Sequence, residues 1–505
     1  MPGGELQLSY YGEEDIILNG NPQITFFVSV FKRYTNFAIE NIRQYFVGEA
    51  DFGKKVQCII DKCGDLMSDV FLQIKLPSLV EFNNKIKDTN LEYRWINYIG
   101  NAIIDYVEIE IGTTIIDKHY GIWLQIWAEL TITDEKKEGY YEMIGYSGDN
   151  PYFNIQTEYN LYIPLIFWFC KCKGLALPLL ALQESSVRIN VVFRKATDLI
   201  IRKNCSLTNI ETINCGNTLI TKGGLKIQEA HLYVDYIFLD DNERRWFINN
   251  EHEYLIEQLQ LDSQTLHTRG TKNTKCNVDK NGTIIDEDGK ECSKSIQNHR
   301  VHIDFKHPVK ELIWVFVGEN MVEINETTGY QGNEWFNFGI NTYENCKNNK
   351  NEPVEGDIGY NEEFNLNSLI TNEFDEDCNP NDHTIDGLTI NAKYGINPSN
   401  ISPMIDATLY FEGNERFETK EYQYFKLIQP YQNHTNIPLD WIYTYSFAFE
   451  PEKVKPTGTC NFSHIDNTHF VFNLSKYVVN PQLNMFATNY NILKIKGGIG
   501  SVRYK

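Results

Sequence analysis

The sequence predicts a mainly β protein that consists of two tandem antiparallel jelly rolls of eight strands each, with a few short helices and long polar loops. Short apolar segments that alternate or run continuously recur along the chain between turn signals, which is typical of strands. The aromatic share is 13%, from 30 Tyr, 29 Phe and 8 Trp, and such residues favour strands. The length of 505 residues suits two β domains of roughly 200–250 residues better than one.

The middle of the chain predicts the boundary between the two domains. Residues 233–238 alternate as a strand does, Asp240 or Asp241 can begin a short helix, and 252–260 is extended again. We therefore expect an inter-domain linker whose characteristic residues are Asp241, Arg244, Arg245 and Trp246. The expected parts are an amino-terminal arm (1–24), a first jelly roll (25–240), a helical linker (241–250) and a second jelly roll (251–505).

The first half contains eight expected strands and two segments with helical spacing. Val107–Ile111 and Ile115–Ile116 flank a turn at Gly112–Thr114, which predicts a hairpin. Apolar residues recur at helical intervals in Leu91–Ala102 and in Trp123–Leu130. The other expected strands are Ile24–Phe31, Arg43–Val47, Val56–Ile60, Val70–Leu76, Val187–Phe193 and His231–Leu239.

The second half contains seven expected strands and two polar insertions, at 262–300 and 323–386. In the first insertion, the turn signals Asn281-Gly282 and Asp288-Gly289 flank Thr283–Ile285 and predict a small projecting β-ribbon. No internal repeat is readable between the two halves. The expected strands are Glu253–Leu261, Val301–Phe305, Leu312–Val317, Ala407–Phe411, Tyr443–Phe449, His469–Leu474 and Tyr490–Ile495.

The formal net charge of −22 argues against direct binding of nucleic acid, because phosphate recognition needs clustered cations. The acid is concentrated between Glu323 and Asp386, where 15 acidic residues accompany only two lysines. We interpret this region as a solvated outer loop. A Ca²⁺ site is the sharper alternative, but the carboxylates lack regular ligand spacing.

The targeting and redox signals are those of a soluble protein made in the cytosol. The first eight residues have neither the basic region nor the apolar core of a signal peptide. The most apolar stretch, Leu161–Leu182, is interrupted by Pro164, Lys171 and Pro178, among other residues, so it does not suit a membrane-spanning helix. The 11 cysteines include no CxxC motif, and we expect buried reduced thiols. Cys276 and Cys292 could pair in an oxidising medium.

Each segment that approaches a catalytic or ligand-binding motif lacks an essential part of it. Gly48–Lys55 resembles a phosphate-binding loop but ends in lysine where Ser or Thr is needed, and it precedes a strand. His252-Glu253 lacks the second histidine of a zinc protease. His299 and His302 would point to opposite faces of a strand, so they do not suit a metal pair. Asp279–Glu291 lacks the turn glycine of an EF-hand loop. Gly497–Gly500 has no following helix to receive a dinucleotide. Because no pair of carboxylates stands out either, the chain is predicted not to be an enzyme, with no catalytic residue, cofactor or metal site.

Seven Asn-x-Ser/Thr sequons occur in this Asn-rich chain. Asn281 and Asn325 lie in the expected outward loops, so they are the two candidates for glycosylation. The other sequons are at Asn204, Asn400, Asn433, Asn461 and Asn473.

Several sequence blocks resemble the major capsid proteins of nucleocytoplasmic large DNA viruses, and their composition is most similar to that of the mimivirus-like giant viruses of protists. The blocks appear in the family's order from near residue 5 to the end, and the segment 233–260 resembles the family's inter-domain block. The insertions 262–300 and 323–386 match no family motif. The other blocks are Gly20–Ala38, Ile116–Thr131, Tyr162–Gln183, Tyr424–Asp466 and Asn489–Ser501.

The resemblance implies a structural role. Such a chain would form a homotrimer whose six jelly rolls make a pseudo-hexagonal capsomer, and capsomers would tile an icosahedral virion shell over an internal membrane. Its partners would be other copies, minor capsid and penton proteins and, indirectly, the membrane, with assembly in the host cytoplasm. The arm at 1–24 would lie on the inner side. The alternative from the residues alone is a carbohydrate-binding or carbohydrate-cleaving β-sandwich, which the Tyr and Trp content and the acidic loops would suit.

Overall fold

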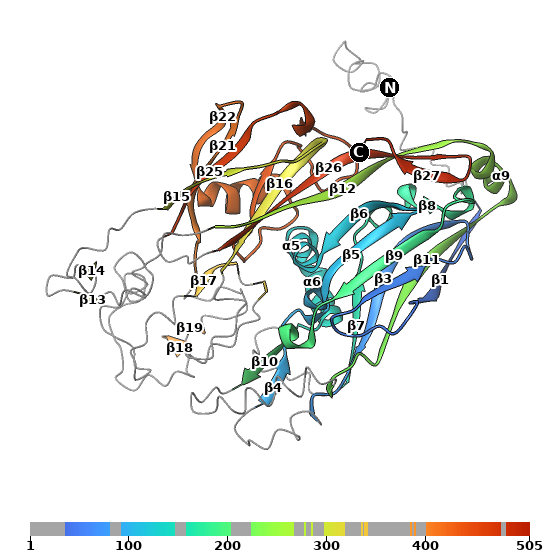
Figure 1. The fold of residues 1–505 in the computed structure, drawn as a ribbon, viewed down its shortest axis with the longest axis horizontal. Coiled ribbons are helices and arrows are strands. Elements are labelled where there is room, and N and C mark those ends of the chain that lie inside the picture. The colour runs from blue at the N-terminus through green and yellow to red at the C-terminus, as the bar shows by residue number, and fades with distance from the viewer. Residues whose placement is uncertain are drawn as a thin grey trace, which may run out of the picture.

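The protein consists of two β-sandwiches that lie side by side in a computed structural model (Figure 1). The described residues up to β11 form the first sandwich, the helix α9 (Asp241–Asn249) lies at one corner, and the described strands after it form the second. The residues that the structure describes are 36–80, 92–146, 158–203, 224–266, 297–318, 400–475 and 481–504, with short pieces at 277–278, 284–285, 335–336, 338–341, 384–385 and 388–389.

The first sandwich has two antiparallel sheets. One has the strand order β1-β11-β3-β7, and the other has the order β2-β9-β5-β6. The strands of the first sheet are β1 (Phe37–Tyr45), β11 (Glu229–Leu239), β3 (Leu66–Leu76) and β7 (Tyr159–Pro164), with β8 (Leu177–Pro178) also paired to β3. The strands of the second are β2 (Lys55–Ile59), β9 (Val187–Phe193), β5 (Ile104–Ile111) and β6 (Thr114–Tyr120).

The second sandwich repeats this plan with the orders β12-β26-β16-β23 and β15-β25-β21-β22. The strands of its first sheet are β12 (His252–Thr265), β26 (Gln482–Lys496), β16 (Pro308–Val317) and β23 (Tyr443–Ser446), with β24 (Cys460–Asn461) and β27 (Ile499–Val502) as additions. The strands of its second sheet are β15 (Gln297–His302), β25 (Thr468–Leu474), β21 (Met404–Phe411) and β22 (Asn414–Glu421).

The two sandwiches have the same topology. If the eight main strands of each are numbered along the chain, both have the orders 1-8-3-6 and 2-7-4-5 in their two sheets. This is the wrapped arrangement of a jelly roll, in which strands from both ends of the domain become neighbours. The predicted mainly β fold of two eight-stranded jelly rolls is confirmed, and the internal duplication that no sequence repeat revealed is visible in the strand order.

Strand periodicity explains where the cores lie. In β3 the side chains of Leu72, Ile74 and Leu76 are buried while Gln73 and Lys75 between them are partly exposed, as expected for a strand with one face on a core. The second core is strongly aromatic, with Trp314 and Phe470 ring centroids 5.0 Å apart. Because each aromatic side chain buries a large apolar area, these rings fill much of the second core.

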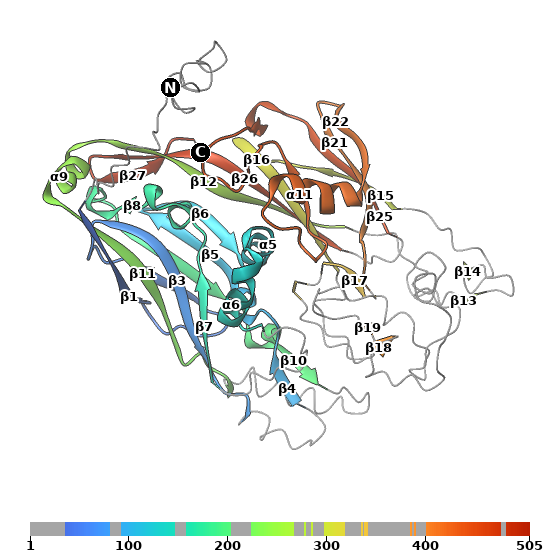
Figure 2. The same ribbon diagram turned by 180° about the vertical axis from the view of Figure 1, so that it is seen from behind.

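Helices are short, and several lie where the two sandwiches meet. Figure 2 shows α5 (Gly121–Thr131) and α6 (Asp134–Ile144) on the side of the first sandwich that faces α11 (Gln429–Asn433) of the second. The helix expected at Trp123–Leu130 is therefore confirmed. The other described helical pieces are α4 (Ile99–Ile103), α7 (Trp168–Lys171), the 3-10 turns at Lys173–Leu175, Leu179–Ala181, Ala196–Leu199 and Phe462–His464, and the π-helical turn η10 (Tyr424–Ile428).

Some expected elements were wrong in type or extent. The helical spacing of Leu91–Ala102 was misleading, because β4 (Glu92–Trp95) pairs with β10 (Ile200–Lys203) and only α4 is helical. The first insertion is shorter than 262–300, because β12 continues to Thr265 and β15 begins at Gln297. Strand bounds expected at Arg43–Val47, Val301–Phe305 and Tyr443–Phe449 are corrected to those of β1, β15 and β23.

Several predictions can be compared with the described residues only in part. Within the expected ribbon, β13 (Asn277–Val278) pairs with β14 (Ile284–Ile285), whereas the turn residues Asn281-Gly282 and Asp288-Gly289 lie outside the described residues. Buried thiols are confirmed for Cys58, whereas Cys63 and Cys172 are exposed. Further two-residue strand pairs are β17 (Ile340–Asn341) with β20 (Asn400–Ile401), and β18 (Thr384–Ile385) with β19 (Leu388–Thr389). The predictions that lie outside the described residues include the arm at 1–24, the strand Ile24–Phe31, Cys276 and Cys292, and nearly all of the acidic insertion 323–386.

Candidate functional site at the junction of the two sandwiches

In one sheet of the second sandwich, the central strands β16 and β26 are buried on both faces, and this sheet forms the junction. In β16, Leu312, Trp314 and Phe316 point into the core of the second sandwich. Ile313 and Val315 of the same strand belong to the apolar cluster of the first sandwich. A strand covered on both sides carries a continuous apolar run rather than an alternating one, which is why this segment reads Leu-Ile-Trp-Val-Phe-Val.

The apolar part of the junction is centred on α5 of the first sandwich. The Trp123 ring lies 5.3 Å from the ring of Phe486 on β26, centroid to centroid. Trp123 is 2% exposed and Phe486 is fully buried, so water is excluded between them. Burying such aromatic side chains contributes roughly 1.5–3 kcal/mol each. The two sandwiches are consequently packed as parts of one body.

Polar contacts fix the register across the junction. Strand β12 passes β6 of the first sandwich, where the Gln258 side-chain amide donates to the carbonyl oxygen of Ile116. Next to it, the backbone N–H of Leu259 donates to Asp117 Oδ1 at 3.0 Å. These bonds satisfy polar groups that the packing removes from water, and leaving them unpaired would cost about 1–3 kcal/mol each.

A buried ion triad connects the sandwiches through Glu257 on β12. Its carboxylate lies 2.7 Å from Lys171 Nζ of the first sandwich and 2.5 Å from Lys310 Nζ on β16. The Lys310 side chain is fully buried and Glu257 is 5% exposed. Burial alone would raise the pKa of Glu257, but the two ammonium groups hold it below its ordinary value. Lys310 Nζ also donates to the Pro451 carbonyl at 2.5 Å, so the buried ammonium group is bonded to protein atoms.

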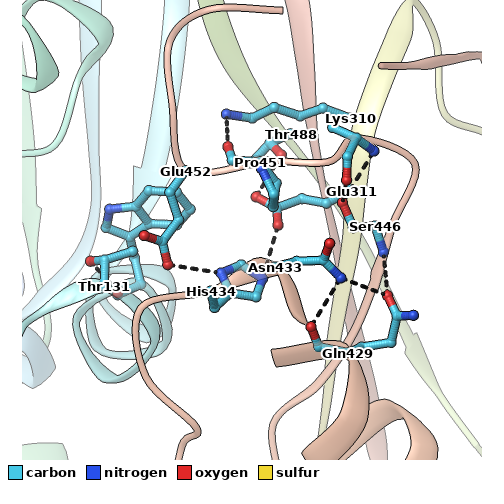
Figure 3. Close-up of polar contacts among 12 residues, drawn as sticks. Thr131, Lys310, Glu311, Gln429, Asn433, His434, Ser446, Pro451, Glu452 and Thr488 are labelled. Atoms are coloured by element: carbon cyan, nitrogen blue, oxygen red, sulfur yellow. Dashed lines mark hydrogen bonds and ion pairs between the residues drawn. The ribbon is translucent and has the colours of Figure 1, made fainter. Parts of the chain in front are cut away.

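A second buried cluster lies beside the triad and is shown in Figure 3. The His434 imidazole lies between two carboxylates, with Nε2 3.2 Å from Glu311 Oε2 and Nδ1 3.1 Å from Glu452 Oε1. The His434 and Glu311 side chains are both fully buried. Burial would lower the pKa of His434, but the two carboxylates outweigh it and raise the pKa to about 9. Thr488 adds a hydroxyl bond to Glu311 at 3.0 Å. The cluster is therefore charged near neutral pH.

The His434 cluster anchors a loop that contacts the first sandwich. Two residues further on, the Asn436 backbone N–H donates to the Leu130 carbonyl at 2.9 Å, and its side-chain amide donates to the Ile132 carbonyl. Both acceptors lie at the carboxyl end of α5, where carbonyl groups lack helical partners. The loop thus caps α5 and adds to the junction.

Asp440 makes this loop sensitive to pH. Burial, and then the nearby Glu129 carboxylate of α5, raise the pKa of Asp440 from its ordinary 3.8 to about 7. Because the folded-state pKa lies above the unfolded one, the contribution of Asp440 to stability is highest below about pH 3.8, falls as pH rises from there to about 7, and is constant above. We expect Asp440→Asn to be more stable than wild type at pH 8, on the order of 1–2 kcal/mol, with a smaller difference at pH 5. Thermal melts at both pH values measure this, and an equal difference at both would contradict it.

The carboxyl-terminal hairpin also lies on the first sandwich. Gly497 and Gly498 have φ values of +58° and +80°, and Lys496 pairs with Ile499, which defines a two-residue turn that favours glycine at both positions. The Glu184 N–H of the first sandwich donates to the Gly498 carbonyl at 3.0 Å. A Cβ on Gly500 would lie 2.8 Å from Ile111. The glycine motif at Gly497–Gly500 therefore permits close packing.

The predicted linker residues lie on α9, at the corner where the chain passes from β11 to β12. Arg244 Nε lies 3.0 Å from Asp65 Oδ1, and this ion pair connects α9 to the first sandwich. The Trp246 side chain is 56% exposed and packs edge-on against His252 with 5.2 Å between centroids. Asp241 and Arg245 are exposed, and Asp240 rather than Asp241 is the amino-terminal cap residue, although its side chain makes no capping bond. These residues are not part of the buried junction.

Other sequence candidates are placed as follows. Gly48–Lys55 leads into strand β2, whereas a phosphate-binding loop would lead into a helix. His299 stacks on Phe472, while His302 contacts His469, and the two do not converge. Among the described residues, no group of His, Cys, Asp or Glu is arranged to hold a metal ion, and none of the helices is long and apolar enough to cross a membrane. Asn281 and Asn325 lie outside the described residues.

The sequence did not identify the junction residues. Lys310 and Glu311 stand at the start of a strand whose other residues are apolar, and two charges in such a strand are a signal that buried partners exist. Nothing local indicates that these partners are Glu257 and His434, which are 53 and 123 positions away along the chain. Only the fold brings the four side chains together.

Two protein-family models match the chain and together cover nearly all of it. The model described as "Major capsid protein N-terminus" matches residues 25–240. The model described as "Large eukaryotic DNA virus major capsid protein" matches residues 243–501, slightly more than half of the chain. The gap between the two matches falls at the start of α9.

Curated relatives match over full length. The chain is 34% identical to the major capsid protein of Phaeocystis pouchetii virus and 29% identical to capsid protein 1 of Acanthamoeba polyphaga mimivirus, with 100% of both chains covered in each case. Among solved structures, a chain in the quasi-atomic model of the PBCV-1 virus capsid is similar with a TM-score of 0.66 and 25% identity, covering 95% of this chain and 100% of that chain. The Faustovirus major capsid protein has a TM-score of 0.61 at 13% identity, covering 96% and 94%, and supports the fold alone.

Proposed function

We propose that this chain, which belongs to the family of large eukaryotic DNA virus major capsid proteins and is thus a structural component of the virion shell, assembles as a homotrimer. Three copies supply six sandwiches, and six similar sandwiches around a threefold axis approximate a hexagon. Such pseudo-hexagonal capsomers would tile an icosahedral shell over an internal membrane. The single observation that supports this best is the repeated strand order of the two sandwiches.

The rigidity of the junction supports a tiling role. A shell subunit performs no chemistry and must instead hold its edges in fixed positions while neighbours bind. Glu257 and Gln258 on β12 bind side chains and backbone of the first sandwich, and Trp123 packs on Phe486. Strand β12 therefore gives the two sandwiches a shared element in place of a flexible connection.

The finer assignments follow from the same proposal. The chain would divide into the arm, the two jelly rolls and the α9 linker at 1–24, 25–240, 241–250 and 251–505, with Asp241, Arg244, Arg245 and Trp246 on the linker. Minor capsid and penton proteins would be further partners, the membrane would be contacted indirectly, and nucleic acid would not be bound. Assembly would occur in the host cytoplasm, Asn281 and Asn325 would be the glycosylation candidates, and no catalysis is assigned. The family assignment replaces the carbohydrate-directed alternative as the leading function.

The mass of the purified protein in solution tests the proposed function. We expect size-exclusion chromatography with light scattering to give three times 58.8 kDa, about 176 kDa, at micromolar concentration and neutral pH. Negative-stain images of the same fraction should show particles with hexagonal outlines. If the protein remained a 58.8 kDa monomer at every concentration up to 100-fold above the micromolar range, the proposal would be contradicted.

A further inference from the structure

The surface around η10 and α11 has an unusual distribution of polarity. Six large apolar side chains within one 23-residue stretch are exposed to solvent: Leu427 by 44%, Ile428 by 45%, Tyr431 by 78%, Ile437 by 41%, Leu439 by 38% and Phe449 by 83%. We call these six residues the α11 patch. On the opposite, buried side of the same helical turns lie Lys426 and Gln429. Phe425 is buried on that side as well, so these turns carry apolar side chains on both faces, whereas a surface helix normally keeps its outer face polar.

The patch is built on a framework of buried polar contacts, so its shape is fixed. Lys426 Nζ donates to the carbonyls of Pro438 and Leu439 at 3.1 and 3.0 Å, which ties the following loop beneath the helix. Gln429 Oε1 accepts from the Ser446 backbone N–H at 3.0 Å. The His434 cluster shown in Figure 3 then binds Glu452, three residues after Phe449. A preorganised surface loses little freedom when a partner covers it, and this raises affinity.

The charges around the patch favour a second copy of this chain as the partner. The chain carries −22, so two copies repel wherever acidic surfaces meet. No acidic residue occurs from Tyr422 to Leu439, and the two cationic residues of this stretch, Lys426 and His434, have buried side chains. The acid next to Phe449, Glu450, is paired with Lys453 at 2.5 Å. Copies can therefore meet here with less repulsion than over the acidic remainder.

The position of the patch is continuous with the junction inside the molecule. The loop that carries Ile437 and Leu439 is bonded to the end of α5 through Asn436. A neighbouring copy that covers the patch would thus contact the edge of both sandwiches at once. Contacts at such an edge can be repeated around a closed ring, because each copy offers the patch to one neighbour and a different surface to the other.

We propose that the α11 patch is the self-association surface of this chain and binds a second copy within the trimer. This inference rests on the proposed homotrimer and adds to it the location of the contact. Exposed aromatic residues commonly dominate such interfaces, so Tyr431 and Phe449 are the residues expected to contribute most.

A double variant, Tyr431→Glu with Phe449→Glu, tests this proposal in the full-length chain. Both side chains are more than three-quarters exposed, so the fold does not depend on them, and the far-UV circular dichroism spectrum should match wild type. The concentration below which the trimer dissociates should be roughly 100-fold or more higher than for wild type. Light scattering should then detect a 58.8 kDa species where wild type is still trimeric. The matched control is Trp246→Glu with Ile248→Glu on α9, where the wild-type side chains are 56% and 50% exposed, and it should remain trimeric.

A photo-crosslinker at position 431 provides a second measurement that does not depend on dissociation. p-Benzoylphenylalanine there should link chains on irradiation, whereas the same group at position 246 should not. A double variant that stays trimeric, or a control that dissociates equally, would overturn the assignment of the patch and leave the homotrimer standing. A wild-type chain that is monomeric would instead remove the proposed function itself. Loss of binding to phosphatidylcholine vesicles with the trimer intact would assign the patch to a membrane and overturn self-association.

Discussion

Replacing Glu257 with alanine should lower the free energy of unfolding by about 3–5 kcal/mol at pH 7. The substitution leaves the fully buried ammonium of Lys310 without its carboxylate, and removing one partner of a buried pair costs more than the pair contributes. For a domain of about 150–250 residues, 1 kcal/mol shifts the melting temperature by about 2–4 °C. Differential scanning fluorimetry at a fixed scan rate should therefore show a loss of roughly 6–20 °C.

Two further variants separate the unpaired charge from lost packing. Glu253 lies on the same strand, is about half exposed and pairs with Lys494 at 3.2 Å, so Glu253→Ala should cost no more than about 1 kcal/mol. The double variant Glu257→Leu with Lys310→Met removes both charges and should recover much of the loss. If Glu257→Ala melted within 2 °C of wild type, roughly the resolution of the comparison, the triad would have no stabilising role.

Replacing His434 with leucine should cost about 3–5 kcal/mol near pH 6.5, because Glu311 would remain ionised, fully buried and without its cation. The size of this loss depends on pH. The folded-state pKa of His434 is raised to about 9 from 6.5, so its contribution is fully present below about pH 6.5 and is lost as pH rises through 9. The difference between wild type and variant should shrink steadily from pH 6.5 to pH 10.

Chemical denaturation at several pH values measures this difference. His464 is the matched control, since it is exposed on the 3-10 turn Phe462–His464, and His464→Leu should change stability by less than about 0.5 kcal/mol at every pH. A loss for His434→Leu that stayed constant between pH 6.5 and pH 10 would show that packing, rather than the imidazolium charge, accounts for it.

Local patterns predicted the elements that depend on nearby residues. The hairpin of β5 and β6 was predicted from its alternation and the glycine turn, and α5 from its single apolar stripe. The strand–helix–strand order around α9 was predicted in the same way. In these segments the period of the sequence and the required contacts agree, so the sequence is sufficient.

The missed elements lack such agreement. Strand β22 reads Asn-Glu-Arg-Phe-Glu-Thr-Lys-Glu and is exposed on most of its length, so no apolar alternation marks it. Helix α6 begins with Asp-Glu-Lys-Lys-Glu and buries only Tyr140 and Ile144. Both are held by neighbours rather than by their own pattern. The polar junction was missed for the same reason, since its pairs join residues far apart in the sequence.

The sequence marks the segment that carries most of the α11 patch by its lack of acidic residues. This segment, Tyr422–Leu439, contains no acid in a strongly acidic chain and carries several apolar residues beside a proline and polar amides. That composition reads as ordinary core, and only the exposed fractions of Tyr431 and Phe449 show that these side chains point outward. Sequence composition thus locates the segment, while its outward face is a tertiary property.

The strands that are buried on both faces, β16 and β26, have a mechanical consequence. Tension applied to either sandwich passes directly into strands such as β16, whose side chains interlock with both cores. No compliant joint lies between the two halves in the part of the chain that the structure describes, so a tile of this kind would respond to internal pressure as a stiff plate. Any bending of a shell made from it would then occur at the seams between tiles.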